Sequence, residues 1–170
     1  MGTGKTSVGS ALAAALRWPL SDSDFEIEAA TGRTAREIAR DDGPDAIHLE
    51  EQRHVLRALV APAPIIVCAA ASVVEFADCR AAMKERAVVL WLRAELEVLV
   101  ERFDHGGHRP QYGDDLRDMF QVQIETREPL YREIADLIVD VDSDPLTPAE
   151  ISQSVISQLF DQSLVRSKQS

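Results

Sequence analysis

Residues near the start of the chain have types and spacing suited to binding phosphate. In "MGTGKTSVG", Gly4, Lys5 and Thr6 form the second half of the pattern G-x-x-x-x-G-K-[ST]. In that pattern backbone amides wrap the phosphates, the lysine reaches the outer phosphates and the hydroxyl group ligates magnesium. Gly2 lies two residues before Gly4, and Ser7 directly follows the tripeptide. The tripeptide alone could arise by chance, so the interpretation depends on the residues further along the chain.

Two carboxylates follow the predicted first helix. Asp22 and Asp24 lie directly after the short run "WPLS", which could form a strand that delivers both side chains at its carboxyl end. One carboxylate there could help to hold magnesium, and the other could orient an acceptor hydroxyl and accept its proton. The alternative is that "SDSD" forms a solvated turn.

Helical signals surround these groups. Residues 5–17, "KTSVGSALAAALR", are rich in alanine and leucine and predict a helix that ends before Trp18-Pro19. Its amino terminus would add a partial positive charge to the phosphate site. Thr34 and Glu37 form a capping-box pattern with Gly43 placed to end that helix, and a longer helix is expected over residues 45–60.

Three short apolar runs, "PIIVCAAA", "AVVLWL" and "ADLIVDVD", are typical of buried parallel strands flanked by helices. "TPAE" then offers a cap for a last helix. The alternation predicts an α/β three-layer sandwich with a mainly parallel sheet. We expect one domain over residues 1–163, with a candidate lid at about residues 104–115 and a polar tail at 164–170.

Composition narrows the class of partner. The 170 residues carry a formal net charge of −11, which disfavours general attraction to nucleic acid or to an anionic membrane. The two cysteines have neither metal-ligand spacing nor disulfide density, and there is no signal peptide or long apolar run. We therefore expect a cytoplasmic protein that is a monomer or a weak dimer.

Several motifs in order resemble the shikimate kinase family. "GTGKTSVG", "DSDFEIEAATGRTAREIARDDG", "RPQYG" and "TREPLYREIADLIVDVD" are similar to that family's loop, aspartate segment, lid and last helix-strand unit. The resemblance implies a P-loop NTPase fold with five parallel strands in the order 2-3-1-4-5. It also implies ATP and a small hydroxylated acceptor as partners, with Mg²⁺ as the cofactor.

The resemblance assigns roles one residue at a time. Lys5 would stabilise the transferred phosphoryl group, Asp24 would meet the acceptor hydroxyl, and the lid residue Arg109 would close over the phosphates. Arg102 would stack on the adenine, and Arg127 would hold an acceptor carboxylate. Each arginine has a plain alternative as a surface salt-bridge partner. The full sets are catalytic Lys5, Asp24 and Arg109; nucleotide-binding Gly2, Gly4, Lys5, Thr6, Ser7, Arg102 and Arg109; acceptor-binding Asp24, His48, Ala70, Ala71 and Arg127; and metal-binding Thr6 and Asp22.

The acceptor side departs from the family pattern. His48 stands where the family has a second carboxylate-binding arginine, and Ala69–Ala71 stand where it has three glycines. Alanine at a positive φ would cost on the order of 1 kcal/mol, and the added methyl groups would narrow the pocket. His48 has a structural alternative facing Glu51, although the acidic segment of Glu50, Glu51 and Asp45 is most simply a solvated face. The expected acceptor is shikimate or a related polyol.

The family's first strand and the first glycine of its loop would have to precede Met1. In the order 2-3-1-4-5 that strand is central. Either Met1 is an internal methionine of a longer reading frame, which we favour because the other signals agree with one another, or the chain is truly truncated. The predicted activity is ATP-dependent phosphoryl transfer to a small-molecule hydroxyl. The alternatives are a catalytically impaired nucleotide-binding or interaction protein, and a bare NTPase.

Overall fold

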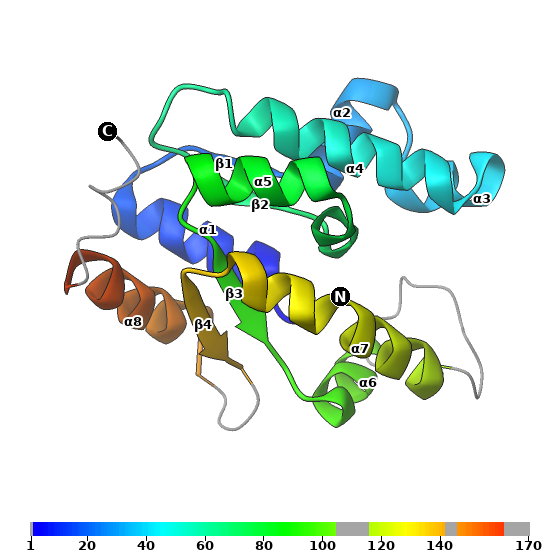
Figure 1. Ribbon diagram of the computed structural model, residues 1–170. Helices are drawn as coiled ribbons and strands as arrows, with labels where there is room; N and C mark the ends of the chain where they lie inside the picture. The colour runs from blue at the N-terminus through cyan, green and yellow to red at the C-terminus, as the bar shows by residue number, and fades with distance from the viewer. Residues whose placement is uncertain (1, 105–115, 142–145, 162–170) are drawn as a thin grey trace.

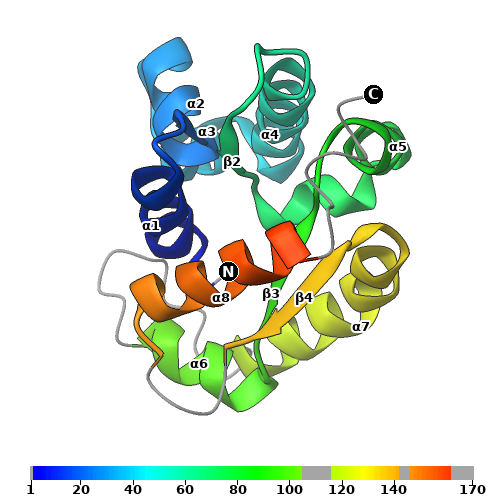
Figure 2. The ribbon, with the colours of Figure 1, turned by 90° about the vertical axis from the view of Figure 1, so that its left-hand side faces the viewer.

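Helices cover both faces of a set of short parallel strands. Figure 2 shows α1 and α8 on one side of the strands and α4, α5 and α7 on the other. The structure is a computed structural model that describes residues 2–104, 116–141 and 146–161. Within these residues the elements are α1 (Lys5–Leu16), β1 (Leu20–Asp22), α2 (Ser23–Thr31), α3 (Ala35–Asp42), α4 (Pro44–Ala58), β2 (Ile66–Cys68), the 3₁₀-helix η1 (Ala71–Glu75), α5 (Ala77–Arg86), β3 (Leu90–Arg93), α6 (Leu96–Asp104), α7 (Leu116–Ile134), β4 (Leu137–Asp140) and α8 (Pro148–Asp161).

The strands form two separate parallel pairs (Figure 1). β1 pairs with β2 in the register Leu20↔Ile66, and β3 pairs with β4 in the register Leu90↔Leu137. Among the described residues, β2 pairs with β1 alone and β3 pairs with β4 alone, so β2 and β3 are not hydrogen-bonded to each other. The order 2-3-1-4-5 without its central member leaves two such pairs, so the pairing agrees with the predicted arrangement.

Local signals explain where the first helix begins and ends. Gly4 occupies the left-handed region with φ +83°, which suits glycine, and α1 begins at the next residue. Arg17 closes α1 with φ 56°, directly before the Trp18-Pro19 pair that was expected to end it. The helix predicted over residues 5–17 is therefore confirmed.

Capping boxes start two other helices. The Thr34 side chain accepts a hydrogen bond from the Glu37 backbone, and the Glu37 carboxylate accepts one from the Thr34 backbone. Thr147 and Glu150 repeat this exchange at the start of α8. Both caps were predicted from sequence, and each satisfies amide groups that an uncapped helix leaves without partners.

Two hydrophobic clusters pack on the strands, one on each face. The first joins α1 and α8 to β3 and β4, and the second joins α4, η1, α5 and α7. Their buried members are Val8, Leu12, Leu92, Leu137, Val141, Ile151 and Val155 in the first cluster, and Val55, Val73, Val74, Cys79, Met83 and Ile134 in the second.

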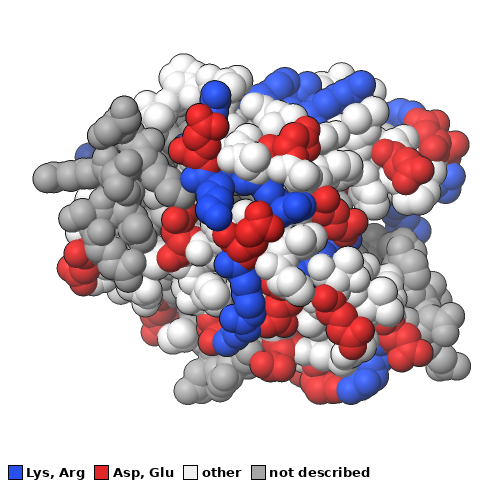
Figure 3. Space-filling view, viewed as in Figure 1, with Lys and Arg blue, Asp and Glu red and all other residues white. Residues whose placement is uncertain are grey.

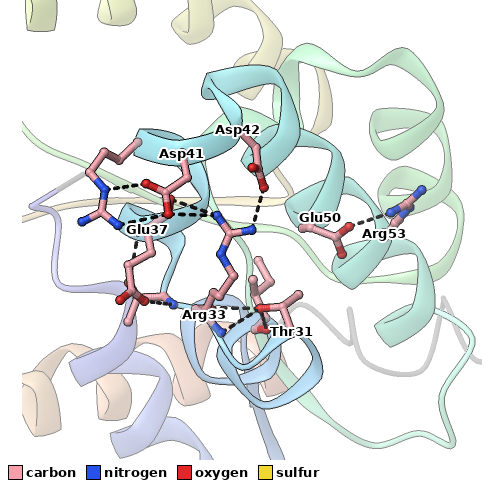
Figure 4. A network of polar contacts seen from close by, with 10 residues as sticks. Thr31, Arg33, Glu37, Asp41, Asp42, Glu50 and Arg53 are labelled. Atoms are coloured by element: carbon pink, nitrogen blue, oxygen red, sulfur yellow. Dashed lines mark hydrogen bonds and ion pairs between the residues drawn. The ribbon is translucent and has the colours of Figure 1, made fainter.

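A network of polar contacts fixes the junction between α2 and α3 (Figure 4). The Arg33 guanidinium donates to Asp42 at 2.7 Å and to Asp41 at 3.4 Å, and it also donates to the Glu37 carbonyl. The Arg33 backbone N–H donates to the Thr31 hydroxyl. The ion pairs are exposed, so each adds little stability.

Charges of both signs are interspersed over the face drawn in Figure 3. No helix within residues 2–104, 116–141 or 146–161 combines the length and the apolar character needed to cross a bilayer. The predicted lid at about residues 104–115 and the predicted tail at 164–170 lie outside the described residues, apart from residue 104 at the end of α6. The domain limits therefore remain predictions.

Candidate active site

The phosphate-loop residues lie at the amino terminus of α1. Gly2 and Gly4 both have positive φ, at +80° and +83°. The amide groups of Lys5, Thr6 and Ser7 occupy the first turn, where they have no partner within the helix. This geometry directs several N–H groups and the positive end of the helix dipole toward one point, as an anion site requires.

Thr6 connects this loop to the predicted aspartates. Its hydroxyl donates to the Asp22 carboxylate at 2.8 Å, and the second oxygen of Asp22 accepts the Asp24 N–H at 3.1 Å. Asp22 is only 5% exposed and caps α2, whereas the Asp24 side chain is exposed. The interpretation of "SDSD" as a solvated turn is therefore wrong, since Asp22 is a buried, bonded carboxylate at a strand end.

The donor atoms of this cluster fit magnesium. Thr6 and Asp22 offer two adjacent oxygens, the ligand type that Mg²⁺ prefers. Mg²⁺ commonly takes one or two carboxylates and completes its shell with water and substrate phosphates. The described residues contain no group of three or more His, Cys, Asp or Glu side chains that could hold a metal ion.

Glu51 lies close to three of the predicted acceptor residues, Asp24, His48 and Arg127. Its carboxylate accepts a short hydrogen bond from the Ser72 hydroxyl. Burial raises the pKa of Glu51, while the hydrogen bond from Ser72 and the positive charges of His48 and Arg127 lower it, and the charge of Asp24 raises it. The charged groups that act on this carboxyl come from α2, α4 and α7, so these three helices bring their side chains together here.

The position of Glu51 differs from the one predicted from the sequence. It was expected on a solvated helix face with Glu50 and Asp45, but it is half-buried and bonded to η1. Only its spacing of three residues from His48, which puts both on one side of α4, could have suggested this position. His48 itself is half-buried and lies near enough to Glu51 for its charge to act on that carboxyl.

Arg127 is held in place by its neighbours. Its guanidinium donates to Glu75 at 2.5 Å and to Gln123 at 3.0 Å, and its side chain is 14% exposed. Tyr131, one turn further along α7, donates its hydroxyl to the Ala71 carbonyl at 2.9 Å. Burial raises the pKa of Tyr131 to about 12, so this hydroxyl stays a donor at neutral pH.

The sequence did not indicate the four residues that make these contacts, which are Glu75, Gln123, Ser72 and Tyr131. The contacts of Ser72 and Glu75 cross 21 and 52 residues of chain.

The expected strain at the three alanines does not arise. Ala70 has φ −62° and ψ 152°, an ordinary extended conformation, and Arg17 is the single non-glycine residue with positive φ within the part of the chain that the structure describes. Ala69 and Ala70 instead pack against the second hydrophobic cluster, and η1 begins at Ala71. The sequence expectation was wrong here because the chain turns into η1 through extended rather than left-handed backbone.

The remaining nucleotide residues are only partly described. Arg102 donates to the Val141 carbonyl at 2.7 Å, and its Cβ lies 3.9 Å from the position of a Cβ built on Gly2. Arg102 therefore stands beside the phosphate loop and is tied to the backbone at the end of β4. Arg109 lies outside the described residues.

A buried serine-histidine pair connects β1 to α4. The Ser21 hydroxyl and His54 Nε2 lie 2.9 Å apart, and His54 is 3% exposed. Burial lowers the pKa of His54, which keeps the ring neutral near pH 7. The pair joins α4 to the strand that carries Asp22.

Comparison with known proteins gives one consistent result. A family model described as shikimate kinase matches residues 1–160. The chain is 38% identical over 141 residues to the shikimate kinase of Cereibacter sphaeroides, covering 82% of this chain and 70% of that relative. It is 34% identical to the shikimate kinase of Bordetella pertussis, covering 94% of this chain and 74% of the relative.

The solved structures agree. The shikimate kinase of Acinetobacter baumannii, solved in complex with shikimate, superposes with a TM-score of 0.86 at 25% identity, covering 95% of this chain and 89% of that one. The predicted fold class, a P-loop NTPase fold with parallel strands, is therefore confirmed.

Proposed function

The chain belongs to the shikimate kinase family, and from that premise we propose that it transfers the terminal phosphoryl group of ATP to a hydroxyl group of shikimate or a closely related polyol. The observation that carries this proposal is the chain of contacts from Thr6 through Asp22 to Asp24. It connects the phosphate loop to an exposed carboxylate on the acceptor side. A kinase needs both groups close to one acceptor molecule: the phosphate loop that holds the transferred group, and the carboxylate that accepts the proton of the hydroxyl.

Each residue has a distinct part in the proposed reaction. Lys5 and the amides of the first turn of α1 would hold the outer phosphates and offset the charge that spreads over the transferred group. Asp24 would orient the acceptor hydroxyl and accept its proton as the new bond to phosphorus forms. Asp22 would hold Asp24 through the hydrogen bond to its backbone amide.

We propose that Thr6 and Asp22 hold Mg²⁺ with the nucleotide. The ion, when bound, would neutralise charge on the phosphate oxygens. Arg102 would face the base of the nucleotide, and Arg109 remains a proposed clamp on the phosphates.

The acceptor residues support an anionic polyol. Arg127 presents a planar cation whose orientation Glu75 and Gln123 already fix, and a preorganised guanidinium suits a carboxylate. Shikimate is bound in the solved relative from Acinetobacter baumannii. Here His48 replaces a second arginine, so we expect this chain to bind a carboxylate acceptor with fewer charged contacts.

The proposal is tested by an assay of ADP release and of phosphorylated product with ATP, Mg²⁺ and a panel of hydroxy acids and cyclitols. Asp24→Asn should lower kcat for the best acceptor by about 10²-fold or more, because the amide cannot accept the proton. Asp45→Asn, which changes an exposed carboxylate in the first turn of α4, is the matched control.

Three results would contradict the assignment. Unchanged activity of Asp24→Asn would remove Asp24 from its role. Binding of ATP without turnover on any acceptor would favour the catalytically impaired alternative. Release of phosphate without an acceptor would favour a bare NTPase.

A further inference from the structure

The short helix η1 is bonded to α7 at both of its ends. At its start, the Ala71 carbonyl accepts from the Tyr131 hydroxyl at 2.9 Å. At its end, the Glu75 carboxylate accepts from the Arg127 guanidinium at 2.5 Å. η1 therefore connects Ala70 and Ala71, which were predicted to bind the acceptor, with the arginine proposed to bind the acceptor's carboxylate.

The Arg80 side chain extends from α5 to the end of η1. Its Nη1 donates to the Val74 carbonyl at 2.8 Å and to the Glu75 carbonyl at 3.2 Å. Val74 is 0% exposed, so without Arg80 its carbonyl would lose this bond in a place that water does not reach. A guanidinium at this position also bonds the last carbonyls of a helix, which lack partners within the helix.

The same guanidinium faces α7. Arg80 Nε lies 3.3 Å from the Glu133 carboxylate, and the Arg80 side chain is only 17% exposed. α5 packs against both η1 and α7, and Figure 2 shows it beside α7. One planar cation therefore contacts both elements that the ion pair of Glu75 and Arg127 joins.

The ion pair of Glu75 and Arg127 depends on where the backbone of η1 lies. The Glu75 side chain is 39% exposed, and holding an exposed side chain in one geometry costs conformational entropy. Arg80 fixes the carbonyl of Glu75 and that of the residue before it, so the carboxylate extends from a backbone that cannot shift freely. Small displacements matter here, because a misplacement of about 1 Å can cost roughly 10²-fold in activity.

We propose that Arg80 is a positioning residue for the acceptor: it fixes the end of η1 against α7, and Glu75 then holds Arg127 in the orientation that binds the acceptor's carboxylate. The inference rests on the proposed function, which assigns that carboxylate to Arg127. Arg80 acts through Glu75 and touches neither ATP nor the acceptor. Removing the Arg80 guanidinium should therefore weaken acceptor binding more than it slows turnover.

The test compares two variants of Arg80 with a control on the same helix. Arg80→Met removes the guanidinium and keeps a long apolar stem, whereas Arg80→Lys keeps a cation without a donor at the place of Nε. Lys84→Gln, which changes an exposed cation of α5, is the control. Isothermal titration calorimetry gives the Kd of shikimate, and steady-state kinetics give kcat and the KM of shikimate and of ATP.

A second measurement reports on Arg127 without an acceptor or activity. Arg127 Nε donates the bond to Glu75, so exchange of the Nε–H proton with water is slow while that bond persists. The exchange rate is measured by NMR of labelled side-chain nitrogens. The signal is assigned by its loss in Arg127→Lys.

The expected result separates the acceptor from the nucleotide. Arg80→Met should raise the Kd and the KM of shikimate at least about tenfold, leave the KM of ATP within about twofold and lower kcat less than about threefold. Exchange at the Arg127 Nε–H should be at least about fivefold faster. Arg80→Lys should lie between the unchanged chain and Arg80→Met, and Lys84→Gln should match the unchanged chain.

Three outcomes would overturn the proposal. Unchanged exchange at the Arg127 Nε–H in both Arg80 variants would show that Arg80 does not support the bond to Glu75. A lower Tm with an unchanged Kd of shikimate would leave Arg80 a structural role alone. Equal rises in the KM of shikimate and of ATP would mean that the whole site is disturbed.

Two further results have a defined meaning. If Arg80→Met does not fold, the Kd of shikimate and the exchange rate in Arg80→Lys decide in the same way. If the unchanged chain binds no shikimate, the proposed function fails, and the exchange rate alone then decides whether Arg80 positions Arg127.

Discussion

At the scale of single residues, the fixed cation Arg127 and the carboxyl of Glu51, whose pKa burial raises, act on each other beside the proposed acceptor residues. The pKa of Glu51 is raised, chiefly by burial, so the folded protein favours the protonated carboxyl. A group with a raised folded pKa adds stability that is fully present below its unfolded pKa and is lost as pH rises through the folded value. Ionised Glu51 should therefore weaken the fold at neutral pH.

Glu51→Gln should raise the Tm by about 2–4 °C at pH 7 to 8, because a neutral amide avoids the desolvation of a charge and can still accept from Ser72. The gain should shrink as pH falls and vanish near the ordinary glutamate value of 4.5. Thermal unfolding across pH measures it. Glu50→Gln is the control because Glu50 is also half-buried but is paired with Arg53 of the same helix (Figure 4), and a similar gain there would contradict the explanation.

Arg127 gives a second prediction at this scale. Arg127→Lys should raise the KM of a carboxylate acceptor at least about tenfold, since the planar fork is lost while one charge is kept. The KM of a polyol without a carboxylate should change little. Steady-state kinetics with a matched acid and alcohol distinguish the two. An equal rise for both acceptors would mean that Arg127 acts by positioning α7 rather than by binding the acid.

At the scale of elements, α1 and β2 pack so closely that one glycine is required. A Cβ built on Gly9 would lie 2.2 Å from Cys68 Sγ, well inside contact distance. The approach fixes α1, and with it the phosphate loop, against the end of β2.

Gly9→Ala should therefore destabilise the protein, because overpacking costs about 1–3 kcal/mol and the helix preference of alanine returns at most about 1 kcal/mol. Adding Cys68→Ala removes the atom in the way, so the double variant should be more stable than Gly9→Ala alone. Chemical unfolding of the four proteins of this cycle measures the coupling. Strictly additive effects would contradict the predicted clash.

Sequence patterns predicted the elements that depend on local signals. The alanine-rich run before Trp18-Pro19 and the Thr34 and Thr147 capping boxes involve neighbours in sequence, and all three are present. The contacts of Glu51 with Ser72 and of Arg127 with Glu75 were not predictable because they join distant parts of the chain. A sequence motif can predict that Arg127 belongs to the site. That Glu75 is the carboxylate bound to it follows only from the packing of α7 on η1.

At the scale of the whole molecule, the two strand pairs are bridged by helices rather than by a continuous ladder of hydrogen bonds. The mostly apolar cavity of about 840 Å³ that lies between them should bind 8-anilinonaphthalene-1-sulfonate, which fluoresces in apolar surroundings, while the folded chain keeps its helical circular dichroism. A folded chain that leaves the dye dark would contradict this prediction.

The position of the proposed acceptor residues has a consequence for how this protein can diversify. Asp24 and His48 come from the continuous stretch α2–α4, whereas the phosphate loop belongs to α1 and the other proposed acceptor residues, Ala70, Ala71 and Arg127, come from later in the chain. α2 and α4 pack on each other, and α3 packs on both. Replacing residues 23–58 by those of a relative would therefore exchange Asp24 and His48 together while the phosphate loop stays unchanged, and we expect such a graft to be the simplest route for engineering the proposed acceptor preference.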